Sequence, residues 1–496
     1  MDIRTAADLM GAQGVRLSAE LFDKEIVGFS IDSRTTGAGE LFFALSQADY
    51  ARAGFNGTFV DAHRFIPQAL EKGAVAAVAR RDHFERDAEL RAMSDRLLLV
   101  EDAIAALQTL AHEVYAAWGR PVVAITGSAG KTTAKELTAH LLKSAGRRVL
   151  KSERNYNNGL GLPLAVLQMV TEGHTPDEFD LAVLEMGMSS PTHEIERLCK
   201  ITPPDIGVEL LVAPVHLEHL GTIENIAAAK AELIEGLKPG GTAVLNADDE
   251  RVIAMRKIHD GPVITFGIET AADVTAAEID TSRFGRSRFS LRTPLGEAEA
   301  VLPMPGRHNL MNALAAAAVA NCFGIGAEEI ARALRSVAPA KMRGEVIDFA
   351  AGFTVVDDSY NSNPRSLLSI VRTITEASAK GTRRRIVVAG EMLELGPLGE
   401  RMHREAGAEI ARSGVDLLWG VRGLGRAIVE GARAEGMSQE AARYFESSEE
   451  AAAAICDEVR EGDLVLVKGS RGVETDKVVK ALRRRFPALG GDEEKQ

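Results

Sequence analysis

The chain has 496 residues, of which 46% are hydrophobic and 26% are charged, and its formal net charge is −13. This composition predicts a globular protein of about three domains, because a typical domain holds about 100–200 residues. The negative charge and the low aromatic fraction of 5% argue against bulk binding to nucleic acid or to an anionic membrane. An anionic substrate would therefore have to meet a local cluster of basic side chains.

The chain start and the cysteines indicate a cytoplasmic protein. The first residues, Met-Asp-Ile-Arg-Thr, lack the basic start and apolar block of a signal peptide. No apolar run approaches the length of about 18 residues that a membrane span needs. Cys199, Cys322 and Cys456 lie far apart without metal-ligand spacing, which is typical of free thiols in a reducing compartment. We expect no membrane span and no nucleic-acid partner.

Residues 1–100 have the pattern of a small α/β domain. Short apolar runs at 25–31 and 40–45 predict strands, and residues 69–79 run from a helix end through Gly73 into a Val/Ala strand. Apolar residues at helical spacing then predict a helix over 102–118, before a Gly-Arg-Pro break. We place this helix at the start of a central domain, residues 101–339.

A glycine-rich turn between a strand and a helix is the strongest functional signal in the central region. The apolar run 122–126 predicts a buried strand, and the helix begins at Lys131. Small residues let backbone N–H groups approach phosphate oxygens, and the helix N-terminus adds positive potential. Lys131 would reach the β- and γ-phosphates of ATP, and the Thr132 hydroxyl would bind Mg²⁺. The predicted nucleotide-binding residues are Gly127, Ser128, Ala129, Gly130, Lys131, Thr132 and Thr133.

The spacing of the two glycines narrows this prediction. Ser128 and Ala129 alone separate Gly127 from Gly130, whereas the common phosphate loop has four residues between its first glycine and its Gly-Lys pair. The short loop argues against a GTPase-type motif. An ordinary strand-to-helix turn is the alternative.

Strands and helices alternate through the rest of the central region. Strands are predicted at 180–186 and 242–246, and helices at 132–144, 224–236 and 306–322. This alternation predicts a doubly wound, largely parallel sheet.

Few polar residues of this region can be selected from the pattern alone. Glu185 ends a buried strand, where a carboxylate would face the ligand crevice and could hold Mg²⁺, although a structural role fits the spacing equally well. The Asn/Gly-rich segment 155–163 indicates only a turn. Spacing by itself selects neither His216 nor Lys230.

A third α/β unit is predicted over residues 340–496. Strands are expected at 353–357, 385–389, 415–419 and 464–467, with helices between them. This pattern is typical of a smaller, Rossmann-like domain. The predicted fold is therefore α/β throughout, with a central P-loop domain between two smaller domains.

The order of the motifs resembles the Mur ligases, which build the bacterial cell-wall peptide. The Thr-Gly-x-x-Gly-Lys-Thr loop, Glu185 at a strand end, the His216-Leu-Glu-x-x-Gly turn and Lys230, fourteen residues after His216, follow the family order. The resemblance implies an ATP-dependent ligase with two Mg²⁺ sites and a CO₂-derived carbamate on Lys230. It makes Lys131, His216 and Lys230 the catalytic candidates, and it implies four metal ligands: Thr132, Glu185, His216 and the carbamylated Lys230. Glu218 stands where many members carry Asp, so it is assigned no role.

Further likenesses to the family surround the expected nucleotide. Residues 245–249 resemble the segment near the adenine, and residues 306–313 contain the family's His-Asn-x-x-Asn-Ala signature. Arg343 resembles a linker arginine that reaches the ATP phosphates when the third domain closes, and Asp358 resembles a ribose-binding acid. The resemblance thus adds these ATP-binding candidates: Asn246, His308, Asn309, Asn312, Arg343 and Asp358.

Within the family, the chain resembles the members that add D-Ala-D-Ala to a UDP-N-acetylmuramoyl-tripeptide. Residues 357–364, 390–396 and 467–472 carry this likeness, and residues 32–34 with 39–45 resemble the uridine-binding domain. The implied substrate contacts are Ser33, Arg34, Asn157, Asn158, Tyr360, Asn361, Lys468, Ser470 and Arg471. For the last three of these, a solvated loop is the alternative.

Two other functions stay open at this point. The first is a Mur ligase that adds a diamino acid, and the second is a P-loop regulatory protein that binds ATP without ligation. The sequence leads us to expect a monomer, and it does not tell which residue ends the tripeptide.

Overall fold

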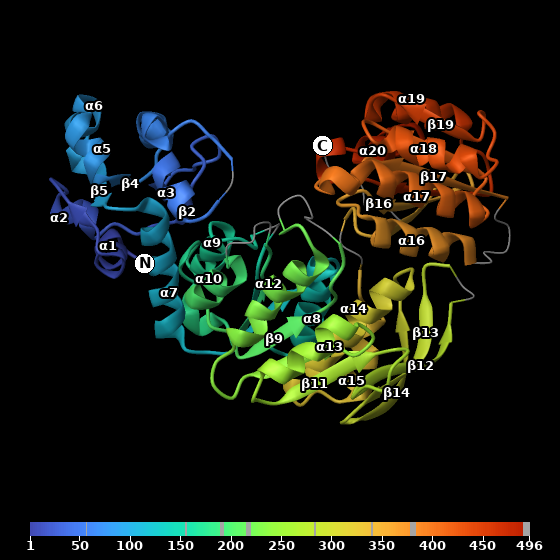
Figure 1. Cartoon of the computed structure of the whole chain (residues 1–496). Coiled ribbons are helices and arrows are strands. Elements are labelled where there is room, and N and C mark those ends of the chain that lie inside the picture. Colours follow the sequence, from blue (N-terminus) through green and yellow to red (C-terminus); the bar gives the residue numbers. More distant parts are fainter. Residues whose placement is uncertain are drawn as a thin grey trace.

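Three β-sheets organise the chain, as the computed structural model shows for residues 1–55, 57–153, 156–188, 193–214, 220–281, 284–338, 341–376 and 383–489. The sheets have five, nine and six strands, and each belongs to its own region of the sequence (Figure 1). This confirms the α/β class and the order of three units. The limits at residues 100 and 339 stay predictions. None of the described helices is long and apolar enough to cross a membrane.

The first sheet has the order β1-β5-β4-β3-β2 and is parallel except for the β1–β5 pair. The predicted strand at 25–31 is shorter in the structure, because only three of its residues pair with β3. The elements of this region are β1 (Gln13–Gly14), β2 (Gly28–Ser30), β3 (Glu40–Phe43), β4 (Ala76–Arg80), β5 (Leu97–Val100), α1 (Ile3–Met10), α2 (Ala19–Phe22), α3 (Gln47–Arg52), α4 (Ile66–Glu71), α5 (Arg81–Arg86) and α6 (Ala88–Ala92).

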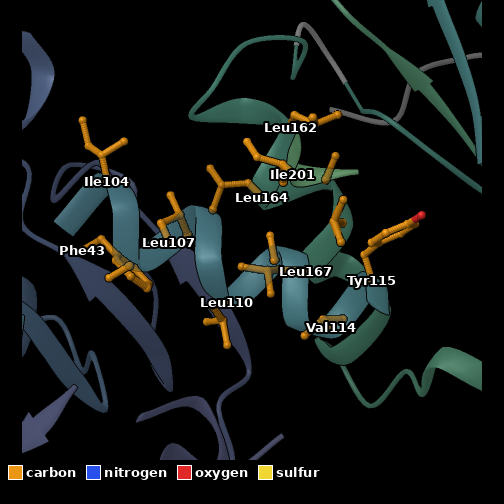
Figure 2. Packing of buried hydrophobic residues seen from close by; sticks show 14 of the residues in the cluster. Phe43, Ile104, Leu107, Leu110, Val114, Tyr115, Leu162, Leu164, Leu167 and Ile201 are labelled. Carbon is orange, nitrogen blue, oxygen red and sulfur yellow. The ribbon is translucent and has the colours of Figure 1, made fainter. Parts of the chain in front are cut away.

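Helix α7 (Ala103–Trp118) joins the first region to the central one. It begins where the Asp102 carboxylate accepts hydrogen bonds from two backbone N–H groups, and it ends at Gly119 in the left-handed conformation. One hydrophobic cluster joins the two regions through this helix (Figure 2). It contains Ile104 and Leu107 of α7, Phe43 of the first sheet and Leu167 of the central region. Substitution of one such fully buried leucine by Ala would lower the free energy of unfolding by about 2–5 kcal/mol.

The central sheet has the order β14-β13-β12-β11-β10-β9-β6-β8-β7. Strands β7 to β12 pair in parallel, which confirms the largely parallel sheet, whereas β12, β13 and β14 form an antiparallel edge that the sequence interpretation did not contain. The strands are β6 (Val122–Thr126), β7 (Val149–Lys151), β8 (Leu181–Glu185), β9 (Ile206–Glu209), β10 (Thr242–Asn246), β11 (Val263–Gly267), β12 (Val274–Asp280), β13 (Ser287–Thr293) and β14 (Gly296–Leu302).

Helices cover both faces of the central sheet. Alternate residues of β6 point to opposite faces, so Val122 packs in the cluster with α7 and Val123 packs in the cluster with α8 and α14. The helices are α8 (Lys131–Ser144), α9 (Gly161–Leu167), α10 (Glu194–Ile201), α12 (Ile223–Glu235), α13 (Glu250–Ala254), α14 (Arg307–Cys322) and α15 (Ala327–Leu334). The predicted helices at 132–144, 224–236 and 306–322 are thereby confirmed within one or two residues.

The third sheet has the order β15-β16-β20-β17-β18-β19, with β15 as its single antiparallel strand. Two hydrophobic clusters cover its two faces, which confirms the Rossmann-like layering. The elements are β15 (Glu345–Asp348), β16 (Thr354–Asp358), β17 (Arg384–Gly390), β18 (Leu417–Val421), β19 (Ala442–Phe445), β20 (Asp463–Lys468), α16 (Pro364–Glu376), α17 (Gly399–Arg412), α18 (Gly425–Ala434), α19 (Ser448–Glu458) and α20 (Asp476–Arg485).

Candidate active site

A cleft of about 830 Å³ lies between the carboxyl edge of the central sheet and the third domain. The carboxyl ends of β6, β8 and β10 reach it from one side, and those of β16 and β20 reach it from the other. Ligands of open α/β sheets bind at such edges. The cleft brings together these residues predicted from the sequence: Ser128, Ala129, Gly130, Lys131, Thr132, Thr133, Asn157, Asn158, Glu185, Asn246, His308, Asn309, Asn312, Arg343, Asp358, Tyr360, Asn361 and Lys468.

The glycine loop can adopt its shape only with glycine at two positions. Gly127 and Gly130 have φ angles of 151° and 85°, and a Cβ atom on Gly130 would lie 2.4 Å from Asn312 Oδ1. Ser128 Oγ accepts a hydrogen bond from the Ala213 N–H at 2.9 Å, which ties the loop to the segment after β9. Gly130 caps α8 without a side-chain hydrogen bond, so backbone N–H groups of the first turn are available to an anion.

The Lys131 ammonium lies over the loop, where its Nζ donates to the Gly127 carbonyl at 2.8 Å. Burial lowers its pKa; the Glu185 and Glu209 carboxylates oppose this effect, and the Arg343 guanidinium adds to it. Arg343 therefore lies near enough for the two cations to repel each other. A polyphosphate bound between them would relieve that repulsion.

Glu185 is held by two side chains at the end of β8. Its carboxylate accepts hydrogen bonds from Thr132 Oγ1 at 2.7 Å and from Asn157 Nδ2 at 2.8 Å, and its backbone N–H donates to Ser152 Oγ at 3.0 Å. A carboxylate and a hydroxyl in contact at a helix N-terminus are hard oxygen donors of the kind that Mg²⁺ prefers. The residues present therefore fit a Mg²⁺ ion between Glu185 and Thr132.

Lys230 is buried on α12 and is 2% exposed. Burial lowers the pKa of its ammonium to about 8, and the Glu209 carboxylate nearby opposes this shift. Lys230 does not line the cleft, so it belongs to the layer beneath. The predicted partner of Lys230 at the metal site, His216, lies outside the described residues, as does all of 215–219.

Sequence reasoning missed Glu209, a fully buried acid at the end of β9. Burial raises the pKa of its carboxyl to about 8, against the opposing charges of Lys230 and Lys131. The signal was the same as for Glu185, namely a carboxylate that ends an apolar strand of a parallel sheet.

The predicted nucleotide-binding amides also support the backbone of the cleft. Asn246 Nδ2 donates to the Leu210 carbonyl at 2.7 Å, and Asn309 Nδ2 donates to the Pro305 carbonyl at 2.7 Å. His308 Nδ1 lies 3.4 Å from Ser369 Oγ of the third domain, and burial lowers its pKa to about 4. These side chains line the cleft and hold its walls at the same time.

The third-domain side of the cleft is built from residues paired with one another. Lys468 Nζ donates to Asp358 Oδ2 at 2.6 Å and to the Asn361 carbonyl at 2.8 Å. The Arg343 guanidinium lies over the Tyr360 ring, 4.0 Å from its centroid. Lys468 is 3% exposed and belongs to β20, so a solvated loop position is wrong for this lysine.

Four other predicted substrate contacts do not line the cleft. Ser470 Oγ accepts a hydrogen bond from the Leu393 N–H at 3.0 Å, and Arg471 lies 3.5 Å from Asp476 with an exposed side chain. Ser33 and Arg34 belong to the first region. The Ser33 carbonyl accepts from Lys72 Nζ at 2.8 Å, and Arg34 is 84% exposed beside Asp32.

Asp61, His63 and His83 form a separate group of possible ligands, whose donor atoms lie within 4.8 Å of one another. His63 already binds Asp61 Oδ1 through Nδ1 at 2.7 Å and accepts from the Arg80 N–H through Nε2 at 2.9 Å. The two rings are stacked with centroids 4.0 Å apart. A metal lies in the plane of each imidazole that binds it, so two stacked rings cannot share an ion without rotation. This group is a structural one.

Comparison with known proteins places these features in a family context. The sequence models described as "Mur ligase middle domain" and "Mur ligase, glutamate ligase domain" match residues 125–320 and 342–471. The chain is 33% identical to the UDP-N-acetylmuramoyl-tripeptide--D-alanyl-D-alanine ligase of Bacillus subtilis, over 92% of this chain and 93% of that one. It is 33% identical to the enzyme of the same name from Escherichia coli, over 94% and 96% of the two chains.

Solved structures agree with this likeness over nearly the whole chain. A crystal structure of MurF from Acinetobacter baumannii matches with a TM-score of 0.80 and 26% identity, over 97% of this chain and 98% of that one. MurF ligase from Thermotoga maritima in complex with ADP matches with a TM-score of 0.76 and 28% identity, over 95% and 99%. The three-domain arrangement of the chain is therefore shared with these structures.

Proposed function

The chain belongs to the Mur ligase family, and we propose that it joins D-Ala-D-Ala to UDP-N-acetylmuramoyl-tripeptide with conversion of ATP to ADP and phosphate. The observation that carries this proposal is the single cleft in which the glycine loop meets the third-domain cations Arg343 and Lys468. It is supported by relatives of that name that match more than nine-tenths of the chain.

The reaction has two steps. The terminal carboxylate of the tripeptide attacks the γ-phosphorus of ATP, ADP leaves, and an acyl phosphate forms. The amine of D-Ala-D-Ala then attacks the acyl carbon, phosphate leaves, and the nitrogen loses a proton. Each step gathers anions, so fixed positive charge and accurate positioning supply most of the catalysis.

The cleft offers that positive charge from both sides. Lys131 and the N–H groups of the first turn of α8 bind the phosphates from the central-domain side. Arg343 approaches the phosphates from the third domain. Asp358 binds the ribose, and Lys468, which is paired with it, contacts the dipeptide. Ser470 and Arg471 do not line the cleft, and we propose that they contact the part of the dipeptide that extends beyond it, from the loop after β20.

Two Mg²⁺ ions are part of the proposal. Thr132 and Glu185 would hold the first, and His216 with Lys230 would hold the second. Bound there, Mg²⁺ would offset the charge of the phosphates and of the attacking carboxylate.

Lys230 contributes to the second site as a carbamate. Its lowered pKa, about 8, leaves a substantial share of neutral amine near neutral pH. The amine nitrogen attacks the carbon of CO₂, one N–C bond forms, and one proton leaves, so the lysine gains a carboxylate-like end. That end is a hard oxygen ligand.

The first domain holds the UDP end of the long substrate. Ser33 and Arg34 contact the uridine diphosphate part, and Asn157 and Asn158 contact the peptide at the cleft. Binding energy from the remote nucleotide end then positions the reacting carboxylate. We also propose that the chain acts as a monomer and that its site of action is the cytoplasm, where ATP is available.

Product formation with each amine offered alone tests this proposal. The purified protein, ATP and Mg²⁺ are mixed with UDP-peptides of two or three residues and either D-Ala-D-Ala or a diamino acid. We expect phosphate release and a product mass only from the tripeptide with D-Ala-D-Ala. Product from the dipeptide with a diamino acid would instead indicate the diamino-acid ligase, and phosphate release without any ligated product would indicate a regulatory ATPase.

A further inference from the structure

Two buried carboxylates flank the end of the strand that leads into the glycine loop. Glu185 on β8 is in register with Ile125 of β6, and Glu209 on β9 is in register with Thr126 of β6. The two side chains are 3% and 0% exposed. Because all three strands are parallel, both acids stand at the edge of the sheet where the phosphates are expected to bind.

The two acids differ in their partners. Glu185 accepts hydrogen bonds from Thr132 and Asn157. Neither carboxylate oxygen of Glu209 has a hydrogen-bond partner in the described part of the chain, and the same holds for the hydroxyl of its neighbour Thr126. A buried carboxyl group without a hydrogen-bond partner is unfavourable, so a ligand that contacts its oxygens would stabilise this position.

Lys230 is near Glu209 but does not satisfy it. Each charge favours the ionised form of the other, yet no hydrogen bond or ion pair within 4.0 Å joins the two among the described residues. On carbamylation the lysine would become an anion as well. Two buried anions with one charge each, close enough to influence each other's ionisation, would be balanced by one divalent cation.

We propose that Glu209 is a carboxylate ligand of the second Mg²⁺, bound between its oxygens and the carbamate of Lys230. The inference rests on the proposed function through the carbamate. It explains why an acid ends β9 although Glu185 already serves the first ion. It also supplies a ligand from β9, which lies on the opposite side of β6 from the strand of Glu185, in the layer beneath the cleft.

Manganese binding tests the inference directly. Electron paramagnetic resonance counts the Mn²⁺ ions bound by the full chain in the presence of bicarbonate and a non-hydrolysable ATP analogue. We expect two ions in the wild type, and in Glu209→Gln one ion together with a second site at least about tenfold weaker, since even loss of a group that only supports a metal ligand costs about 10–100-fold. Two ions of unchanged affinity in the variant would overturn the inference.

Glu232→Gln is the matched control. Glu232 is also a largely buried acid, on the helix that carries Lys230, but it accepts from the Glu196 N–H at 3.1 Å and lies 3.1 Å from His193. This variant should keep both Mn²⁺ ions. Loss of the second ion in Glu232→Gln as well would mean that any nearby charge change disturbs the site, and Glu209 would then have no special role.

Labelling with ¹³C-bicarbonate separates this inference from the carbamate proposal. A labelled Lys230 with an unchanged second Mn²⁺ in Glu209→Gln would overturn the role of Glu209 and keep the carbamate. If Lys230 is unlabelled and Glu209→Gln removes the second Mn²⁺, the carbamate would be overturned and the role of Glu209 as a metal ligand would be kept. The expected outcome is a labelled lysine in both proteins and loss of the second ion in the variant alone.

We expect the Glu209→Gln variant to fold. Among the residues that the structure describes, the Glu209 side chain has no hydrogen bond to lose, so the metal-free variant should melt at the wild-type temperature or above. Diffraction from wild-type crystals with Mn²⁺ gives a second measurement. An anomalous peak about 2.0–2.3 Å from a Glu209 oxygen is expected, and Glu209 oxygens bonded to the Lys230 ammonium with no metal nearby would overturn the inference.

Discussion

Around the glycine loop on the central-domain wall of the cleft, the charged groups are held by backbone and by neutral polar side chains, whereas on the third-domain wall a lysine is held by an acid and an arginine by an aromatic ring. Lys131 bonds the Gly127 carbonyl, and Glu185 bonds a threonine and an asparagine. Across the cleft, Lys468 bonds Asp358, and Arg343 stacks on Tyr360. The first wall is ready to receive ions and phosphates, while on the second wall substrates must join or replace existing pairs.

This difference predicts that single changes on the central wall remove chemistry, whereas changes on the third-domain wall act in pairs and more weakly. The tests below run from the largest expected effect to the smallest.

Lys131→Ala should lower kcat by about 10³-fold or more, because the phosphates lose their main fixed cation in a site sheltered from water. The thermal midpoint should hardly change, because within the described part of the chain the lysine makes one hydrogen bond, to its own loop. Steady-state ATP turnover and calorimetry measure the two quantities. Lys143→Ala, an exposed position at the end of the same helix, is the control and should behave as wild type.

If the Lys131→Ala protein is folded and its turnover is near that of the wild type, the contrast between the two walls would be wrong. The central wall would then not be the phosphate site.

Lys230→Ala should be nearly inactive and partly rescued by added acetate or propionate. The small carboxylate would occupy the space of the lost side chain and supply the oxygen ligand that the carbamate otherwise gives. Activity against carboxylate concentration measures the rescue. Formamide, which has no charge, is the control and should give none. An unmodified Lys230 in active protein, by mass analysis of the intact chain, would contradict the prediction.

Asp358→Asn and Lys468→Met should each lower kcat/KM for ATP or dipeptide by about 10–100-fold, and the double variant should be little worse than either. The two side chains form one unit at 2.6 Å, so a coupling energy of about 1–3 kcal/mol is expected from the cycle. The exposed pair Arg404–Glu400 is the control, with coupling below about 1 kcal/mol. Additive effects of the Asp358 and Lys468 changes would mean that the third-domain wall does not work in pairs.

Arg343→Lys should lower kcat by about tenfold and leave the binding of ATP nearly unchanged. Lysine keeps the charge but loses the flat guanidinium that stacks 4.0 Å from the Tyr360 ring centre, so the cation is less well placed. Single-turnover measurements separate the chemical step from binding. Arg335→Lys, an exposed arginine on the far side of the central region, should have no effect. Equal loss of ATP affinity and kcat would indicate a binding role instead.

His308→Asn should flatten the dependence of stability on pH below neutrality. Burial lowers the folded pKa of His308 to about 4, against an unfolded value near 6.5, so the unfolded state binds the extra proton first. The stability gained from burying the neutral imidazole is therefore complete above about pH 6.5. It is lost as the pH falls toward 4, because the unfolded state then takes up the proton more readily. Thermal midpoints from pH 4.5 to 7.5 measure the difference between the two proteins. Parallel curves would contradict the lowered pKa.

Local patterns were enough to predict the glycine loop and its neighbours. The strand, the turn and the helix over 122–144 are set by β-branched residues, by glycines with positive φ and by a free helix N-terminus, all within one short segment. For Glu185 the local pattern fitted a structural role equally well, and the family resemblance was needed to predict it as a metal ligand. Glu209 carries the same local signal and was missed, because the family resemblance pointed elsewhere.

Long-range pairing could not be predicted in the same way. Lys468 and Asp358 lie 110 residues apart, and they meet because β20 inserts beside β16 in parallel register. Ser470 and Arg471 follow Lys468 in the chain, yet neither lines the cleft, and Ser470 Oγ accepts from the Leu393 N–H instead. The antiparallel strands β13 and β14 were also missed, since their pairing depends on partners rather than on their own pattern.

The amino-acid sequence by itself determined the class of fold, the order of three units and the phosphate-binding loop, because each depends on local periodicity and on turn chemistry. Only the tertiary structure decided which charges meet. It tied Lys468 to Asp358 and placed Arg343 near enough to Lys131 to lower its pKa, and it left the buried Glu209 carboxyl without a hydrogen-bond partner among the described residues. Strand order and the contact between domains decide which charged side chains lie close together. The energy and the protonation state of each charged side chain then depend on its neighbours and on its exposure to water.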